Sequence, residues 1–161
     1  MILIAHRGLI DGPNKNLENH PLQILKSIQL GFDCEIDIHV VNNELYLGHD
    51  GPQYKIDHEF ITKKGLWIHC KNFEALTYCK NYSELNYFWH QTDNYTLTSK
   101  NWFWVYPGNP TNSSSIQVMP EMIDSSLNNL DFQAGGICSD WTLNIQKKYK
   151  EHIKMLLLKI R

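Results

Sequence analysis

The 161-residue sequence lacks several features that would separate it into parts or point to a charged partner. It contains no Pro, Gly or Ser-rich stretch that would link two domains, so we expect one domain over residues 1–161. The 15 Lys and Arg and the 17 Asp and Glu give a net charge of only -2. Bulk charge therefore favours neither nucleic acid nor stable membrane association, and any anion must bind through a local site.

Other absences concern cysteine and targeting. The cysteines lack CxxC spacing, which argues against a zinc or disulfide framework, and we interpret them as buried small apolar residues: Cys34, Cys70, Cys79 and Cys138. The first residues show no basic region, separate apolar stretch or cleavage site of a secretory signal. We therefore expect a cytoplasmic protein. A Gly-rich phosphate loop, a nucleotide-binding fingerprint and internal repeats are also missing.

What the sequence does contain is a series of short apolar runs bounded by polar, Gly or Pro residues. These runs predict eight strands: Ile2–His6, Asp33–Val41, Glu44–Gly48, Leu66–Lys71, Tyr87–His90, Phe103–Tyr106, Ile116–Met119 and Gly136–Ser139. Helical spacing with Pro at the start and Gly past the end predicts a helix over Pro21–Leu30. Further helices are expected from Phe73 to about Leu85 and from Leu143 onward, where apolar residues continue to Ile160.

Eight strands with intervening helices indicate an α/β fold of the (β/α)8 TIM-barrel type. Such barrels usually need about 250 residues, so this one would be reduced, with several helices shortened or missing. Loops or a second subunit would then cover the exposed wall, and we expect a possible homo-oligomer. We expect the last helix to pack on the barrel with its lysines in solvent; the alternative is a basic amphipathic helix on a membrane surface.

Residues that can bind or cleave a phosphate ester lie in or directly after the first three predicted strands. His6 and Arg7 end the first strand, Glu35 and Asp37 lie two apart in the second, and His49 follows the third. Spacing of two directs both carboxylates to one face of a strand, and catalytic residues of a barrel gather at the carboxyl ends of its strands. An arginine grips phosphate, paired carboxylates hold a divalent cation, and histidines transfer protons near neutral pH.

These residues resemble the amino-terminal signature of the glycerophosphodiester phosphodiesterases, a branch of the PLC-like phosphodiesterase barrels. The chain would be a short, divergent member. The resemblance becomes fainter at Ile68 to Lys71 and at Gly136 to Asp140. Only about twenty residues separate His49 from His69, so the subdomain that shapes the family's glycerol site is missing. The clearest matches are His6-Arg7-Gly8, Glu18-Asn19, Gly31, Glu35-x-Asp37 and His49-Asp50.

The resemblance implies a role for each residue. His6 and His49 would be the acid and base pair, and we assign the base to His6. Arg7 and Lys71 would bind phosphate. The metal ligands would be Glu35 and Asp37, with His69 at the place of an acidic ligand, and Glu18 would orient Arg7 or support the metal. Separately, His90 ends a strand and could bind the leaving group, or belong to an ordinary polar loop.

The expected cofactor is a divalent metal, Mg²⁺ or Ca²⁺ by the hard carboxylates, with Mn²⁺ or Zn²⁺ allowed by His69. The predicted activity is hydrolysis of a small phosphodiester, with water or a substrate hydroxyl as nucleophile. Two alternatives stay open: a phospholipase D-like lyase or transferase that forms a cyclic phosphate, and a degenerate barrel that only binds phosphate. Asp140 either reaches the site or caps the last helix, and we favour the cap.

Overall fold

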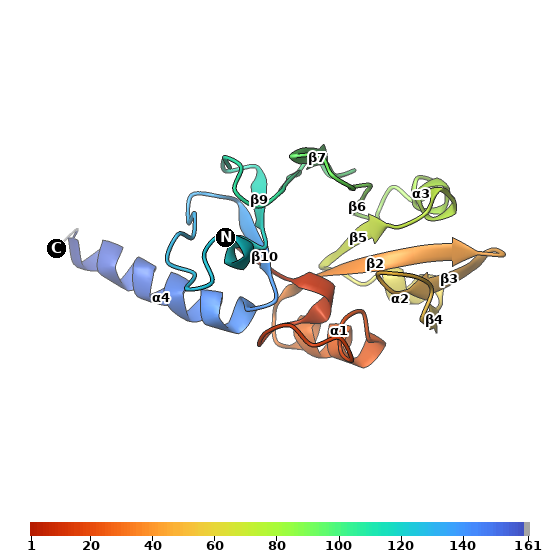
Figure 1. The fold of residues 1–161 in the computed structure, drawn as a ribbon, viewed down its shortest axis with the longest axis horizontal. Coiled ribbons are helices and arrows are strands. Elements are labelled where there is room, and N and C mark those ends of the chain that lie inside the picture. Colours follow the sequence, from red (N-terminus) through yellow and green to blue (C-terminus); the bar gives the residue numbers. More distant parts are fainter. Residues whose placement is uncertain (160–161) are drawn as a thin grey trace.

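The computed structural model describes residues 1–159 and has a mixed α/β fold built on a curved sheet (Figure 1). The helices are α1 (Pro21–Gln29), α2 (His58–Ile61), α3 (Phe73–Cys79) and α4 (Thr142–Lys159), with short 3-10 helices η1 (His6–Gly8) and η2 (Pro120–Met122). The strands are β1 (Ile2–Ala5), β2 (Asp33–Val41), β3 (Glu44–Leu47), β4 (Tyr54–Ile56), β5 (Leu66–Cys70), β6 (Tyr87–Phe88), β7 (Tyr95–Leu97), β8 (Phe103–Val105), β9 (Ser115–Val118) and β10 (Gly136–Ser139).

All eight predicted strands are present, each within two residues of its predicted ends. Seven of them run parallel. The first strand β1 lies between β10 and β2, β2 pairs with β5, and β5 pairs with β6. On the other side β10 pairs with β9, which pairs with β8. In this register Asp37 lies beside His69, and Ala5 beside Ser139. The carboxyl ends of these strands therefore meet at a common edge, as parallel strands require.

The expectation that Glu44–Gly48 is a parallel barrel strand is wrong. The strand β3 runs antiparallel to β2, with Ile38 opposite Leu47, and continues to β4 in a hairpin. Only Asn42 and Asn43 connect the two strands, and both have positive φ values of 51° and 63°. Asparagine favours this conformation, and a connection of two residues permits only an antiparallel return, because a parallel crossover needs a dozen or more.

The sheet is curved, but paired strands do not run round it as a continuous ladder within the described residues. The unpredicted strand β7 pairs antiparallel with β8. Between β6 and the β7 segment only isolated hydrogen bonds are present in the described part of the chain. The Ser99 N–H donates to Tyr87 O over 2.8 Å, the Tyr87 N–H donates to Ser99 Oγ over 3.0 Å, and the Thr96 hydroxyl donates to Trp89 O over 2.9 Å. An α/β sheet of barrel-like curvature is thus shown, while closure into a full barrel is not.

Side chains of β2 point alternately to the two faces of the sheet, and each face packs in its own apolar layer. Cys34, Ile36 and Ile38 are fully buried in a cluster that packs against α1, α2 and α3. The opposite face looks into the curve of the sheet, where Trp67, Phe88 and Trp104 form an aromatic cluster with aliphatic residues of β1, β9 and β10. Large aromatic rings fill this interior. The four cysteines are buried and free, as predicted.

The helices correct the sequence prediction in two places. The first helix α1 is confirmed, with Pro21 in its first turn and Gly31 at φ 89° beyond its end. Helix α3 is shorter than predicted and ends at Cys79. Helix α4 begins where expected, but only its first part packs on the sheet, through Thr142 and Ile145, and the rest extends away from the body (Figure 1).

The outer part of α4 is apolar and exposed. Met155, Leu157 and Leu158 are 57%, 61% and 61% exposed, so the expectation that the last helix packs on the barrel is confirmed for its first part and wrong for its outer part. Ile160 lies outside the described residues. None of the helices within residues 1–159 is both long and apolar enough to span a bilayer. On the outer face of β7 and β8, Leu97 and Phe103 are also exposed, and a homo-oligomer that covers such a wall stays a prediction.

Candidate active site

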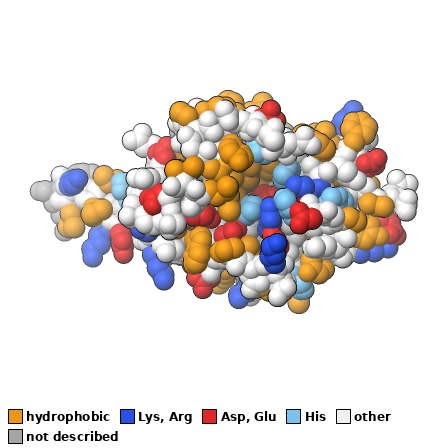
Figure 2. Space-filling view, in the orientation of Figure 1, with side chains coloured by type: hydrophobic (Ala, Val, Ile, Leu, Met, Phe, Trp, Pro, Cys, Tyr) orange, Lys and Arg blue, Asp and Glu red, His pale blue; other side chains and the backbone are white. Residues whose placement is uncertain are grey.

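The predicted site residues converge at the carboxyl ends of the parallel strands. A cavity of about 300 Å³ opens there, on the side of the sheet that faces the aromatic cluster. Figure 2 shows histidine and basic side chains gathered around a hollow near the middle of one face. Of the residues expected from the sequence, the cavity wall contains His6, Arg7, Glu35, His49, His69, Lys71 and His90.

Glu35 and Asp37 lie on the inner face of β2, as their spacing predicts. They are 2% and 0% exposed. The backbone N–H of Arg7 donates to Glu35 Oε2 over 3.0 Å. Asn19 holds Asp37 from two sides: its Nδ2 donates to Asp37 Oδ2 over 2.8 Å, and its Oδ1 accepts from the Asp37 N–H over 2.9 Å. The acidic pair is therefore fixed in position by hydrogen bonds before any ligand binds.

Arg7 reaches the site through an unusual backbone turn. Its φ is 51°, a left-handed value that is uncommon for residues other than Gly, and Gly8 follows at 80°. A Cβ at Gly8 would lie 3.1 Å from the Ile24 side chain of α1, so glycine is required both for its φ and for the close approach of the helix. This turn directs the Arg7 side chain toward the acidic pair.

Two carboxylates lie close to the positive charge of Arg7. Its guanidinium donates to Glu18 Oε2 over 2.6 Å, and its Nε lies 3.2 Å from Asp37 Oδ2. Of the two alternatives for Glu18, the structure shows the contact with Arg7. The candidate metal group found within the described residues contains Glu35, Asp37 and His69 but not Glu18.

The group of possible metal ligands is compact. One ligand atom each from Glu35, Asp37 and His69 lies within 4.8 Å of the others. The Nδ1 of His69 is 3.1 Å from Asp37 Oδ1 and 3.7 Å from Glu35 Oε1, while its Nε2 lies 2.9 Å from the backbone oxygen of His90. Donation from Nε2 to that oxygen would leave Nδ1 facing both carboxylates.

Neighbouring charges shift the pKa values of His69 and Asp37. Burial lowers the pKa of His69, but the hydrogen bond to Asp37 and the charge of both carboxylates outweigh it and raise the pKa to about 9. Burial raises the pKa of Asp37, yet the hydrogen bond from His69 and the charges of His69, Arg7 and Lys71 hold it well below its usual range. The ammonium of Lys71 lies 3.5 Å from Asp37 Oδ1. A metal that binds here must displace the proton from His69.

His6 forms a hydrogen bond with Asp140, for which the sequence favoured a helix cap. Its Nδ1 lies 2.8 Å from Asp140 Oδ1, so the expectation that Asp140 acts only as a helix cap is wrong. Burial lowers the pKa of His6, but the hydrogen bond with Asp140 and the charge of Glu35 raise it overall. Asp140 is held in turn, because its N–H and the Ser139 hydroxyl both donate to Glu121 Oε1. This leaves the Nε2 of His6 available to the cavity.

His49 enters the cavity from the hairpin rather than from a parallel strand. Antiparallel β3 returns the chain to the level of Asp37, where the Gly48 N–H donates to Asp37 O over 3.1 Å. The Nε2 of His39 lies 2.9 Å from Gly48 O and ties the loop to β2. The Nδ1 of His49 lies 2.6 Å from Asp50 Oδ1. The two predicted histidines thus meet at one cavity although β3 runs in the unexpected direction.

His90 lies on the rim. Its Nε2 is 2.7 Å from Asp93 O, and its ring stacks against Tyr106 with centroids 5.9 Å apart. Three residues hold others in place without a role assigned to them from the sequence: Asn19, quoted only within a motif, Asp140, for which the cap was favoured, and Glu121, which was not considered. Asp140 follows β10 as His6 follows β1, so its position at a strand end was a signal that could have found it.

No family model, curated protein or solved structure matches this chain. The resemblance of its motifs to the glycerophosphodiester phosphodiesterases therefore stays a proposal. Function must be argued from the geometry of the site itself.

Proposed function

We propose that this protein is a metal-dependent phosphodiester hydrolase that uses His6 and His49 as its acid and base pair. One observation carries the proposal: residues from separate parts of the chain line the same cavity of about 300 Å³. The wall combines two histidines with separate carboxylate partners, two cationic groups and a carboxylate that belongs to a compact ligand cluster. Few other reactions need all of these groups together.

The residues present fit a divalent cation. Glu35, Asp37 and His69 would hold it, because one ligand atom of each lies within 4.8 Å of the others and both carboxylates are buried. Carboxylates suit Mg²⁺ or Ca²⁺, whereas the imidazole of His69 also suits Mn²⁺ or Zn²⁺. A bound cation would supply Lewis-acid stabilisation of the charge on the phosphate oxygens.

The protein's own residues would do the remaining work. The guanidinium of Arg7 and the ammonium of Lys71 would neutralise the non-bridging oxygens, which is often the largest contribution to such reactions. His6, with its Nδ1 bonded to Asp140, would take a proton at Nε2 from the attacking water or hydroxyl. His49 would donate a proton to the leaving alkoxide. Each proton transfer contributes roughly 10²–10⁴-fold.

We also propose that the curved sheet is a reduced (β/α)8 barrel of the glycerophosphodiester phosphodiesterase kind. Support comes from the seven parallel strands, from the position of the site at their carboxyl ends, and from the hydrogen bonds between β6 and the β7 segment. In this arrangement β7 replaces β3 as the eighth strand of the wall, with reversed direction.

A second candidate function is phosphate binding without turnover. One observation favours it: Asp37 already has three cationic neighbours, Arg7, His69 and Lys71, which balance its charge without a metal. The paired histidines favour hydrolysis instead, because phosphate binding alone needs no proton transfer.

Hydrolysis of bis(p-nitrophenyl) phosphate distinguishes the two functions. We expect turnover by the purified protein that EDTA abolishes and that Mg²⁺, Ca²⁺, Mn²⁺ or Zn²⁺ restores. Lys71→Met should lower kcat/KM about 100-fold because it removes a charge from the phosphate site. Lys26→Met, which removes an exposed lysine on α1, is the matched control and should leave the rate unchanged. Absence of turnover with all four metals would favour the binding function.

A further inference from the structure

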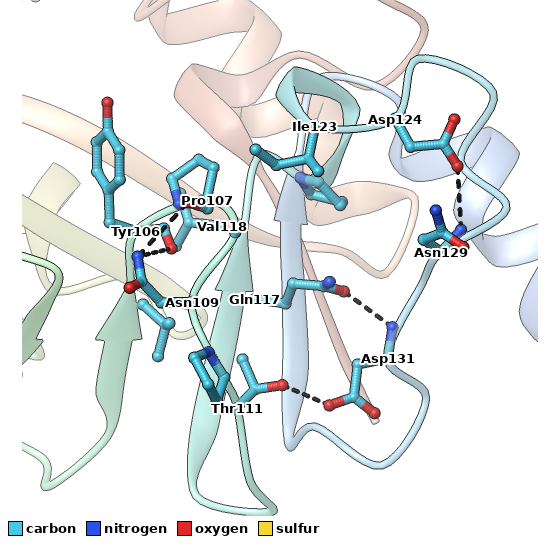
Figure 3. Close-up of a pocket in the computed structure, with 14 residues that line it drawn as sticks. Tyr106, Pro107, Asn109, Thr111, Gln117, Val118, Ile123, Asp124, Asn129 and Asp131 are labelled. Carbon is cyan, nitrogen blue, oxygen red and sulfur yellow. Dashed lines mark hydrogen bonds between the residues drawn. The ribbon is translucent and has the colours of Figure 1, made fainter.

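A second cavity, of about 470 Å³, adjoins the candidate active site (Figure 3). It lies between the loop that follows β8 and the segment that joins η2 to β10. Three residues line both cavities: Tyr106, Pro107 and Val118. A volume of this size is typical of ligand pockets, which span about 300–1,000 Å³. The two cavities are therefore separated only by a shared wall.

The backbone changes direction where the cavities meet. Met119 lines the first cavity and Pro120 the second. Met119 has a φ of 45°, a left-handed value that is uncommon for a residue other than Gly. Its N–H donates to Cys138 O over 2.8 Å, which fixes this turn to β10. One rigid turn therefore shapes both cavities, and strain of this kind is common next to binding sites.

The two cavities differ in their charged groups. Arg7 and Lys71 line the first, together with the carboxylate of Glu35. The second contains two carboxylates, Asp124 and Asp131, and no Lys, Arg or His side chain among its described lining residues. A negatively charged group would be repelled there, because no cation balances the carboxylates. The second cavity thus suits an uncharged part of a molecule whose phosphate lies in the first.

Polar groups of the second cavity are held in place at one end. Asp131 bonds the Thr111 hydroxyl, and its N–H donates to Gln117 Oε1 over 3.1 Å. Asn109 donates to Tyr106 O over 3.0 Å. Figure 3 shows Thr111 and Asp131 at one end of the cavity and Ile123 with Pro107 toward the other. Such a division fits a ligand with hydroxyl groups on its edges and an apolar ring face.

The apolar rim is exposed. Tyr106, Met122 and Ile123 are 41%, 62% and 64% exposed, and they stand next to the two cavities. Apolar residues grouped around a concave site mark ligand binding more often than isolated exposed residues do. Tyr106 offers a flat ring for stacking at the point where a ligand would pass from one cavity to the other.

From these observations we propose that the second cavity binds one ester substituent of the phosphodiester, and that this substituent is an uncharged, hydroxyl-rich group of sugar size. The proposal rests on the proposed function, because it places the phosphate between His6 and His49. The substituent would extend past Tyr106 and Pro107, with its hydroxyl groups at Thr111, Gln117 and Asp131. An anionic substituent would be rejected.

Three p-nitrophenyl phosphodiesters test this subsite. Their second substituent is methyl, glucose linked through its 3-hydroxyl group, or glucuronate linked through the same hydroxyl group. We expect KM to be about tenfold lower for the glucose diester than for the methyl diester, and higher again for the glucuronate. Ile123→Trp should fill the cavity mouth and raise KM for the glucose diester about tenfold, with kcat and the methyl diester unaffected. The control is Leu158→Trp, an equally exposed position on α4.

A charge variant adds an independent readout. Asn129→Lys places a cation on the exposed lining and should lower KM for the glucuronate diester without changing the methyl diester. If the wild type and Ile123→Trp show equal KM values for the glucose and methyl diesters, the subsite is wrong and the proposed function stands.

Failure of all turnover has a different meaning. If the wild type cleaves none of the three diesters with any of the metals, the proposed function is wrong. Calorimetric titration with the methyl diester of glucose 3-phosphate and with dimethyl phosphate then decides the subsite alone. Tighter binding of the glucose compound, lost in Ile123→Trp, supports it; equal binding of both compounds overturns it.

Discussion

His6 lies on the β1 and β10 side of the cavity, where its side chain and that of its partner Asp140 are 16% and 9% exposed. His49 lies on the hairpin side, where its side chain is 35% exposed and that of its partner Asp50 is 88% exposed. Both histidines bond a carboxylate through Nδ1, but only Asp140 is held by further protein groups. The protein therefore controls the protonation of His6, whereas water screens the pair on the other side.

Under the proposed function, this difference indicates how the roles of base and acid divide between His6 and His49. On the buried side, the Asp140 carboxylate fixes the imidazole tautomer and favours its protonated form, as a base requires when it takes a proton. On the exposed side, the hydrogen bond from His49 lowers the pKa of Asp50. His49 is close to solvent, which allows it to regain a proton quickly after each transfer.

The largest expected effect comes from removal of either histidine. His6→Ala and His49→Ala should each lower kcat by roughly 10²–10⁴-fold, because each deletes one proton transfer. Steady-state hydrolysis of a dialkyl phosphodiester, whose alkoxide leaving group needs a proton, measures the loss, and circular dichroism checks that the fold persists. Full activity in purified His49→Ala would remove this residue from the mechanism and leave the buried pair alone.

A smaller effect is expected from Asp140→Asn. Asp140 raises the pKa of His6, so its replacement lowers that pKa, and the neutral base then persists to lower pH. The acidic limb of the pH profile of kcat/KM should therefore move to lower pH, while kcat falls about tenfold as the tautomer is less well fixed. An unchanged acidic limb would show that His6 is not the base.

Asp50→Asn should have the smallest effect. Because Asp50 is largely exposed, its charge is screened and its hydrogen bond exchanges with water, so kcat/KM should change less than about threefold. The pH profile of this variant, measured beside that of Asp140→Asn, sharpens the contrast between the two pairs. A loss as large as that of Asp140→Asn would mean that both carboxylates position their histidines equally.

Much of the site could be predicted from the sequence because strand periodicity acts locally. The spacing of Glu35 and Asp37 places both carboxylates on one face of any strand, and the apolar residues between them place the opposite face in a core. Strand positions could be predicted for the same reason. Helix α1 was recognisable from Pro21 and Gly31, which act through local backbone preferences.

Other features depended on contacts between distant segments. The partner of His6 is 134 residues away, and the position of Asp140 between the end of β10 and the start of α4 fits a bond to His6 as well as a helix cap. The direction of β3 is an exception, because its local signal, the two-residue connection Asn42-Asn43, was overlooked in favour of an apolar run that fits a strand of either direction. The exposed half of α4 has the same apolar spacing as a packed helix, so only its surroundings separate the two cases.

The sequence by itself determined which side chains have the charge and proton-transfer chemistry of the candidate site and which face of β2 presents the acidic pair, because these follow from residue chemistry and a period of two. Only the tertiary structure decided that His6 has a buried carboxylate partner, that His69 stands between Glu35 and Asp37, and that a second cavity without cations adjoins the first. Charge and burial act through space, so groups far apart in the sequence set each other's pKa and shape the cavities only once the sheet has curved.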